Sequence, residues 1–365
     1  MKIAFYSPLK SPRHPVPSGD RLMARLLIAA LRRAGHSVEL ATELRTYLPD
    51  PSPETHCAIR REAVAETNRI SALWTQHGPP DAWLCYHPYY KAPDLIGPKL
   101  ALDFAVPYLT VEASYSSRRN VGGWEQSQQE VLVAIRQAAV NICLTKRDLD
   151  GLRRAAPSAH LTMLAPFIDT LPFMSHAPRP QPDRLITVAM MRKGDKLESY
   201  LLLAEALEQI RDIAWTLSIV GDGACRPQLQ ERYAAFGDRI EWHGEKPTEE
   251  IARLLSQSAL YVWPGCGEAY GLAYLEAQAA GLPVVAMETA GVPEVVAAGR
   301  SGILTPEGDL PALASAIARL LGNEVERRGL AAAARENTRA LHSIEGAAQR
   351  LDAILSTIRE TRDER

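Results

Sequence analysis

The chain has 365 residues, of which 46% are hydrophobic and 23% are charged, and its formal net charge is −2. This length suits two ordinary α/β domains better than one, and the composition is typical of a folded globular protein. The small net charge gives no indication of nucleic-acid binding. Five scattered cysteines without a Cys-x-x-Cys pair predict neither a disulfide framework nor a zinc site, and they favour a reducing compartment.

In the first half of the chain, short β-rich runs alternate with amphipathic helical segments, which predicts a parallel α/β sheet. We expect strands at 2–6, 37–41, 82–86, 107–111 and 140–144, and a helix over 20–34 that Gly35 ends. The apolar start is too short for a signal peptide, and no stretch approaches 18 apolar residues. We therefore expect a cytoplasmic protein without a transmembrane segment, and peripheral contact with the inner face of a membrane remains open.

Three residues at strand ends of this half are candidates for substrate contact. Gly19 lies in the loop between the first strand and the first helix, where capping by Ser18 or Asp20 is the simpler explanation. His87 and Glu112 follow the third and fourth expected strands, at the edge where open α/β sheets bind ligands. The polar loop after Glu112 contains Arg118 and Arg119, which suit an anionic acceptor or a membrane phosphate, although a solvated loop is an equal alternative.

A proline-rich segment at 171–182 predicts the connection between two domains, because it suits neither a helix nor a sheet. A second parallel sheet is expected from strands at 185–189, 215–220, 240–242, 260–263 and 284–287. Near the end of the chain, Leu351, Ile354, Leu355 and Ile358 have the spacing of an amphipathic helix. Asp148 and Asp150 form an Asp-x-Asp pair inside an expected short helix, which we interpret as surface, and no metal site is predicted.

The loop after the strand at 260–263 carries the most informative pattern. A glycine-bearing turn leads into a helix near Gly271, whose free N–H groups and dipole would attract an anion. Glu276 lies about 7 Å further along this helix, near the distance from a diphosphate to the ribose of the same nucleotide. Glu268 lies on the other side of the phosphates. This layout fits a sugar joined through a diphosphate to a nucleoside.

Other residues complete the predicted nucleotide-sugar site. Lys196 and Arg192 follow the strand at 185–189, and both suit diphosphate charges, although a solvated basic turn is the alternative. Tyr270 and Leu272 flank Gly271 and are assigned to substrate binding. His243 and Gly244, after the strand at 240–242, are assigned to the same site.

Residues 185–340 resemble the retaining GT-B glycosyltransferases of family four, which belong to glycosyl transferases group 1. The resemblance rests on Glu268 and Glu276 in an E-x7-E motif, and on a series of flanking segments in the same order: Ser218-Ile-Val-Gly-Asp-Gly223, Ile240-Glu-Trp-His-Gly244, Gly281-Leu-Pro-Val-Val-Ala286 and Gly291-Val-Pro-Glu-Val-Val296. In this family an arginine of this loop binds the diphosphate. Its usual position lies before Arg192 and is occupied by a methionine in this chain.

The resemblance implies a GT-B fold, that is, two Rossmann-like α/β domains with parallel sheets facing across a cleft. The acceptor domain would comprise residues 1–171 and a terminal helix at about 343–362, and the donor domain residues 183–342. It further implies metal-independent transfer of a hexose-type sugar from a nucleoside-diphosphate sugar to a hydroxyl acceptor, with retention and without a cofactor. Glu268, Lys196, Arg192 and His87 would be catalytic, with His243 and Gly244 near the nucleobase.

Three alternatives remain open at this point. A GT-B sugar-nucleotide epimerase would bind the same donor but need no acceptor. A non-catalytic partner subunit would keep the fold, and the displaced arginine is compatible with it, whereas the intact Glu268, Glu276 and Lys196 argue against it. A nicotinamide oxidoreductase would share Rossmann-like domains, but no G-x-G-x-x-G follows the first strand.

Overall fold

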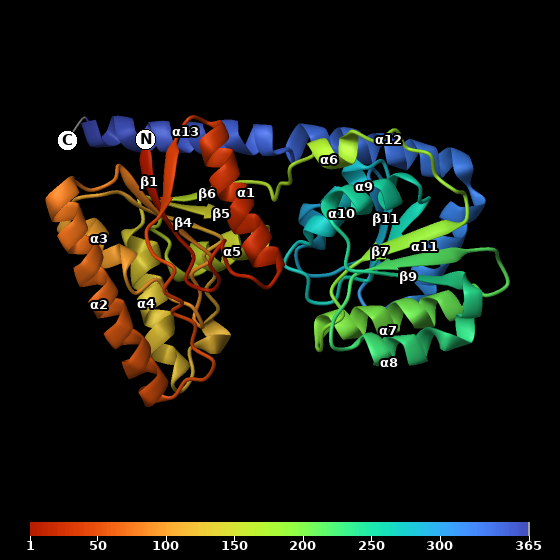
Figure 1. Cartoon of the computed structure of the whole chain (residues 1–365), viewed down its shortest axis with the longest axis horizontal. Coiled ribbons are helices and arrows are strands. Elements are labelled where there is room, and N and C mark those ends of the chain that lie inside the picture. Colours follow the sequence, from red (N-terminus) through yellow and green to blue (C-terminus); the bar gives the residue numbers. More distant parts are fainter. Residues whose placement is uncertain (364–365) are drawn as a thin grey trace. The chain divides into compact units, whose positions relative to one another are not determined.

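The computed structural model describes residues 1–363 and divides them into two compact units. Unit 1 contains Met1–Ala165 together with the chain from Ile344 onward, and unit 2 contains Pro166–Ser343. Each unit has a six-stranded sheet in which all neighbouring strands are parallel. Helices connect the successive strands of each sheet (Figure 1).

The sheet of unit 1 has the strand order β2-β1-β3-β4-β5-β6. Its strands are β1 Lys2–Tyr6, β2 Ser37–Leu40, β3 Ala82–Tyr86, β4 Tyr108–Val111, β5 Val140–Cys143 and β6 Leu161–Met163. Its helices are α1 Gly19–Arg33, α2 Pro53–His77, α3 Gly97–Asp103, η1 Ser117–Arg119, α4 Trp124–Gln137, α5 Lys146–Ala155 and α13 Ile344–Asp363. The order reverses between β1 and β3, so the loops after these two strands flank the crevice where such sheets bind ligands.

The sheet of unit 2 has the order β12-β11-β10-β7-β8-β9. Its strands are β7 Arg184–Val188, β8 Thr216–Val220, β9 Ile240–Gly244, β10 Leu260–Val262, β11 Val284–Glu288 and β12 Gly302–Pro306. Its helices are α6 Leu171–Met174, α7 Asp195–Glu208, α8 Arg226–Tyr233, η2 Ala234–Arg239, α9 Thr248–Ser256, α10 Leu272–Ala279, η3 Val292–Glu294, α11 Leu310–Gly322 and α12 Glu324–Leu341. Here the order reverses between β7 and β10, which places the corresponding crevice at their carboxyl ends.

The central strands are apolar on both faces, as expected for sheets that helices cover. In β3 every residue is buried, and Trp83 packs edge-on against Trp74 of α2 with ring centroids 6.1 Å apart. The last helix, α13, packs on α1 and buries Leu351, Ile354 and Leu355. Arg33 and Glu345 join these two helices through an ion pair of 2.8 Å.

The expected and observed elements differ at three places. The edge strands β6 and β12 were not predicted, because β6 has only three residues and β12 begins with a glycine and ends with a proline. The proline-rich segment 171–182 begins with the short helix α6 and belongs to unit 2. A helix is possible there because Pro172 occupies its first turn, where no intrahelical N–H is needed.

Candidate active site

The polar groups predicted to bind a nucleotide sugar come from the two strands that flank the crevice of unit 2. β7 is followed by the loop that enters α7, and β10 is followed by the loop 263–271 that enters α10. Because β7 and β10 are hydrogen-bonded neighbours, their two loops emerge side by side. Lys196 in the first turn of α7 and Glu268 in the second loop are thereby brought together, although 72 positions separate them in the chain.

Two glycines shape the loop that carries Glu268. Gly271 has a φ of +79°, and a Cβ at this position would lie 2.7 Å from the ring of Tyr274. Gly267 has a φ of +60°, and a Cβ there would lie 2.2 Å from a carboxylate oxygen of Asp195. Both positions therefore require glycine for conformational and steric reasons. The close approach at Gly267 packs the loop directly against the start of α7.

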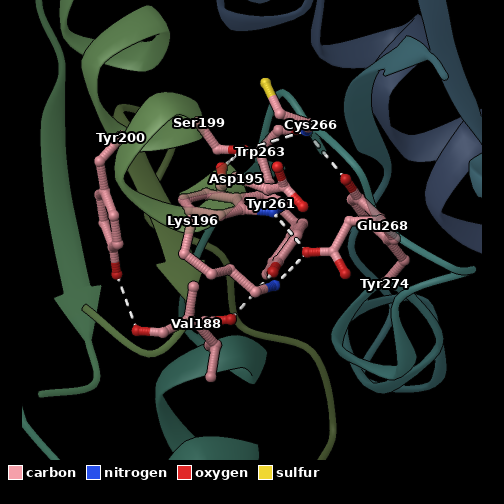
Figure 2. Close-up of polar contacts among 11 residues, drawn as sticks. Val188, Asp195, Lys196, Ser199, Tyr200, Tyr261, Trp263, Cys266, Glu268 and Tyr274 are labelled. Carbon is pink, nitrogen blue, oxygen red and sulfur yellow. Dashed lines mark hydrogen bonds and ion pairs between the residues drawn. The ribbon is translucent and has the colours of Figure 1, made fainter. Parts of the chain in front are cut away.

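Glu268 accepts two hydrogen bonds inside this crevice (Figure 2). One comes from the ammonium of Lys196 in a short ion pair, and the other from the indole N–H of Trp263 at 3.1 Å. The side chains of Lys196 and Glu268 are only 17% and 13% exposed. The Lys196 ammonium also lies 5.4 Å from the centroid of the Trp263 ring. An ammonium and an indole N–H thus fix the position of the Glu268 carboxylate, and the contact of the ammonium with the indole ring holds these two groups together.

Hydrogen bonds behind this trio hold the two loops in place. Tyr274 of α10 donates to the carbonyl of Trp263 at 3.2 Å, and the Trp263 ring meets the ring of Tyr200 edge-on at 4.8 Å (Figure 2). The hydroxyl of Ser199 accepts from the backbone N–H of Cys266 at 3.0 Å. These contacts join α7 to the loop after β10, so the carboxylate and the ammonium are positioned by rigid elements.

In the described chain, no side chain caps the amino end of α10. Gly271 is its N-cap residue, and within the described chain no side chain accepts a hydrogen bond from the first turn. Such an end presents free N–H groups and a partial positive charge. Glu276 lies one turn further along and is partly buried. Burial raises the pKa of its carboxyl group from 4.5 to about 7. A carboxyl group in this state is suited to accept hydrogen bonds from hydroxyl groups that replace the lost water.

The other predicted residues of unit 2 differ in burial and in their neighbours. Tyr270 and Leu272, on either side of Gly271, are buried. Arg192 is exposed, whereas the preceding Met191 is fully buried. The guanidinium of Arg192 makes no ion pair with any described residue, so the structure does not bring it to Glu268 as it does Lys196.

His243 and Gly244 end β9, the edge strand that β8 separates from β7. The Nε2 atom of His243 lies 3.5 Å from a carboxylate oxygen of Glu241, and burial lowers the pKa of the imidazole. Gly244 has a φ of +68°, and its carbonyl accepts from the N–H of Gly221 at 2.8 Å. The two residues therefore stand beside the Gly-Asp-Gly turn rather than beside Glu268.

A second cluster of candidate residues lies at the crevice of unit 1. His87 and Glu112 directly follow β3 and β4, and they have φ values of +59° and +57°. Such conformations are rare for residues other than glycine, and they cluster at functional sites. The Nδ1 atom of His87 lies 3.2 Å from a carboxylate oxygen of Asp20. Burial alone lowers the pKa of His87, but the carboxylates of Glu112 and Asp20 outweigh it and raise the pKa to about 9.

Gly19 begins α1, and Ser18 is its N-cap, whose hydroxyl accepts from the N–H of Arg21. This confirms the capping explanation for Ser18.

The surface assignment of the Asp-x-Asp pair was wrong for Asp148, which is buried and exchanges hydrogen bonds with Thr145 at the start of α5. Its role there is to cap a helix. Asp150 is exposed and pairs with Arg153.

Two residues of these clusters were not identified from the sequence. Trp263 was assigned only to a buried strand, and its indole contact with Glu268 has no local signature. Asp20 was considered only as a helix cap, although its carboxylate holds His87. Among the side chains described, those of residues 1–360, no group of three or more His, Cys, Asp or Glu has the arrangement of a metal site. No helix in the described part of the chain is both long and apolar enough to cross a membrane.

Glycosyltransferases are among the known proteins that this chain resembles in sequence. Residues 182–323 match the family model of Glycosyl transferases group 1. Alpha-D-kanosaminyltransferase of Streptomyces kanamyceticus is 30% identical over 240 residues, which is 62% of this chain and 62% of that protein. The amylovoran biosynthesis glycosyltransferase AmsK of Erwinia amylovora is 34% identical over 154 residues, or 40% of this chain. That match spans only 38% of the length of AmsK.

Solved structures resemble the chain over nearly all of its length. Sucrose-phosphate synthase from Thermosynechococcus elongatus has a TM-score of 0.75 at 19% identity, covering 99% of both chains. Anabaena HepE in complex with UDP has a TM-score of 0.74 at 16% identity, covering 98% of this chain and all of that one. Together with the two six-stranded parallel sheets, these matches confirm the predicted fold class, a GT-B fold of two Rossmann-like α/β domains.

Proposed function

We propose that this protein is a glycosyltransferase that moves a hexose-type sugar from a nucleoside-diphosphate sugar to a hydroxyl acceptor with retention of configuration. The observation that carries the proposal is the Lys196–Glu268 pair beside the open amino end of α10. The match of residues 182–323 to Glycosyl transferases group 1 and the glycosyltransferase relatives support it. Five free cysteines support a reducing compartment, and we assign the protein to the cytoplasm.

In this proposal, charge stabilisation drives the reaction without a metal ion. As the bond between the sugar and the diphosphate breaks, negative charge develops on the leaving group. The Lys196 ammonium and the N–H groups at the start of α10 stabilise that charge, and Arg192 adds a further cation if its exposed side chain turns inward. Glu276 accepts hydrogen bonds from the ribose hydroxyls. For retention, the acceptor approaches on the face that the diphosphate leaves and gives its proton to the departing phosphate.

The ion pair between Lys196 and Glu268 places the ammonium between two possible anionic partners, the carboxylate and a donor diphosphate. A donor diphosphate competes with Glu268 for the Lys196 ammonium, because both are anionic hydrogen-bond acceptors. When the diphosphate takes the ammonium, Glu268 keeps the indole hydrogen bond of Trp263 and becomes available to the sugar hydroxyls. Donor binding therefore releases the carboxylate that holds the transferred sugar.

The solved structures suggest a first donor to test. HepE has been crystallised with UDP and with UDP-glucose, so we propose a UDP-sugar as the donor of this chain. Acceptor binding is assigned to unit 1, at the crevice of His87 and Glu112. With a pKa of about 9, His87 is cationic at neutral pH and serves as a hydrogen-bond donor rather than as a general base.

The decisive experiment separates donor binding from sugar release. UDP-glucose, GDP-glucose and ADP-glucose are compared by thermal shift, since a ligand at 100 times its Kd stabilises the folded protein by about 2.7 kcal/mol. Release of UDP from UDP-glucose is then followed for the wild type, for Glu268→Ala and for Glu231→Gln, an exposed control on α8. We expect Glu268→Ala to bind UDP and lose turnover, while the control keeps both. Undiminished turnover in Glu268→Ala, or no stabilisation by any of the three donors, contradicts the proposal.

A further inference from the structure

Unit 1 carries a continuous series of aromatic rings that begins at the His87 crevice. The imidazole of His87 stacks on Tyr89 with centroids 5.1 Å apart and planes at 29°. Tyr89 meets Tyr90 edge-on at 5.4 Å, and Tyr90 meets Trp124, the first residue of α4, edge-on at 5.1 Å. All four rings are partly exposed. The series thus reaches from the predicted acceptor crevice to a surface loop.

Backbone hydrogen bonds hold these rings in fixed positions. Tyr89 and Ala92 exchange two backbone hydrogen bonds, of 2.8 and 3.2 Å, which close a tight turn with Tyr90 and Lys91 at its tip. The carbonyl of Lys91 also accepts from the N–H of Leu48 at 2.6 Å. A surface that is organised before its ligand arrives loses little entropy on binding.

Three cations lie over rings of this region. The Lys91 ammonium is 5.5 Å from the Trp124 ring centroid, the Arg119 guanidinium is 5.5 Å from that of Tyr90, and the Arg45 guanidinium is 4.4 Å from that of Tyr47. Among the side chains of residues 1–360, none of these cations has a carboxylate partner within ion-pair distance. The attraction of a cation to a ring face comes from the ring quadrupole and fixes the cation without neutralising its charge. The three charges therefore remain available to an anion.

A cavity of about 420 Å³, within the size range of small-molecule sites, opens at the turn that leads into α4. Its walls are formed by Pro51, Pro53, His56, Gly122, Gly123, Glu125 and Gln126. The Nε2 atom of His56 is buried there and has no hydrogen-bond partner among the described residues. A buried polar atom without a partner is costly unless a ligand or water satisfies it. The cavity therefore offers a hydrogen-bonding position at the turn before α4.

We propose that the surface formed by Tyr89, Tyr90, Lys91, Arg119 and Trp124 binds an anionic saccharide as the acceptor of the transfer. This inference rests on the proposed function, which requires an acceptor hydroxyl. Polarised C–H groups of a pyranose are attracted to aromatic faces, while its carboxylate or phosphate groups pair with the fixed cations. A flat membrane surface would not need a cavity or cations held at defined ring faces, so a discrete oligosaccharide suits the geometry better.

The test uses the full-length protein and two oligosaccharides of equal length, a hexamer of galacturonic acid and neutral maltohexaose. Isothermal titration calorimetry should show that the wild type binds the acidic hexamer at least about tenfold more tightly, as expected for two charge-assisted contacts. The double variant Lys91→Ala/Arg119→Ala should lose this preference. The control Arg136→Ala removes an exposed cation at the opposite end of α4, about 18 Å away, and should keep it.

Donor binding, measured in parallel with UDP-glucose, separates this proposal from the proposed function. UDP-glucose binding should be equal in the wild type and in both variants, which also shows that the variants are folded. If UDP-glucose binds but the two hexamers bind equally or not at all, the acceptor proposal is overturned and the donor site stands. If the wild type instead sediments with phosphatidylglycerol vesicles, and only the double variant loses this, the surface serves a membrane and the saccharide proposal is wrong.

Discussion

Replacement of Glu276 by glutamine tests both the electrostatics of the site and the ribose contact. Burial raises the pKa of this carboxyl group in the folded protein to about 7 instead of 4.5. The folded state thus holds the proton more tightly than the unfolded state, and the charged form of Glu276 destabilises the folded protein. The contribution of Glu276 to stability is therefore greatest below pH 4.5 and is lost as the pH rises through about 7.

The size of this effect follows from the two pKa values. The cost is below about 1 kcal/mol at pH 5 and approaches about 3 kcal/mol at pH 8, because each tenfold change in proton affinity corresponds to about 1.4 kcal/mol. Glutamine is neutral at both pH values and does not carry this cost. For a domain of this size, the variant should melt about 6–12 °C above the wild type at pH 8 and close to it at pH 5.

Thermal melts between pH 5 and pH 8 measure this directly, with Glu231→Gln on α8 as the exposed control. UDP-glucose binding supplies the second measurement. A carboxylate that accepts from ribose hydroxyls binds better when charged, so wild-type affinity should rise from pH 6 to pH 8, while Glu276→Gln shows weaker and flatter binding. If the melting temperatures of wild type and Glu276→Gln change with pH in the same way, the reasoning about burial is refuted. If Glu276→Gln binds UDP-glucose as tightly as the wild type, the ribose contact is refuted.

Three further outcomes concern the remaining charges. Lys196→Ala should cost about 3 kcal/mol in denaturant unfolding, because it leaves Glu268 buried without its cation, and adding Glu268→Gln should restore stability but not UDP-glucose binding. Trp263→Phe keeps the ring but loses one hydrogen bond to Glu268, so UDP release should slow about tenfold while UDP affinity stays constant. Asp20→Asn should lower the pKa of His87 from about 9, as measured by NMR titration. The stability that charged His87 contributes through this pair is complete below pH 6.5 and disappears as the pH rises through 9. An unchanged His87 pKa in the variant would contradict the pairing.

Much of the fold could be predicted because the central strands are continuous apolar runs between turn residues. β1 and β3 were predicted to the residue, whereas the edge strands β6 and β12 were missed because they are short or bounded by glycine and proline. An edge strand buries less surface, so its sequence is less constrained.

The candidate site was predictable where its residues follow a local pattern, as Glu268, Gly271 and Glu276 do. The contacts between distant residues were not predictable in the same way. The ion pair of Lys196 with Glu268 depends on β7 and β10 being neighbours, and the pairing of Asp20 with His87 depends on β1 and β3 being neighbours. Periodicity identifies strands but does not fix their order in a sheet. Only the strand order explains why these side chains meet.

The return of α13 to unit 1 has a consequence for biosynthesis. Unit 2 consists of one continuous stretch of chain, whereas α13, which packs on the first helix of unit 1, follows unit 2 in the sequence. During vectorial synthesis, unit 2 can complete its core on the ribosome while the apolar face of α1 that α13 will cover is still in contact with solvent. Completion of unit 1 therefore follows the synthesis of unit 2, and premature termination before Ile344 would leave α1 without its partner helix.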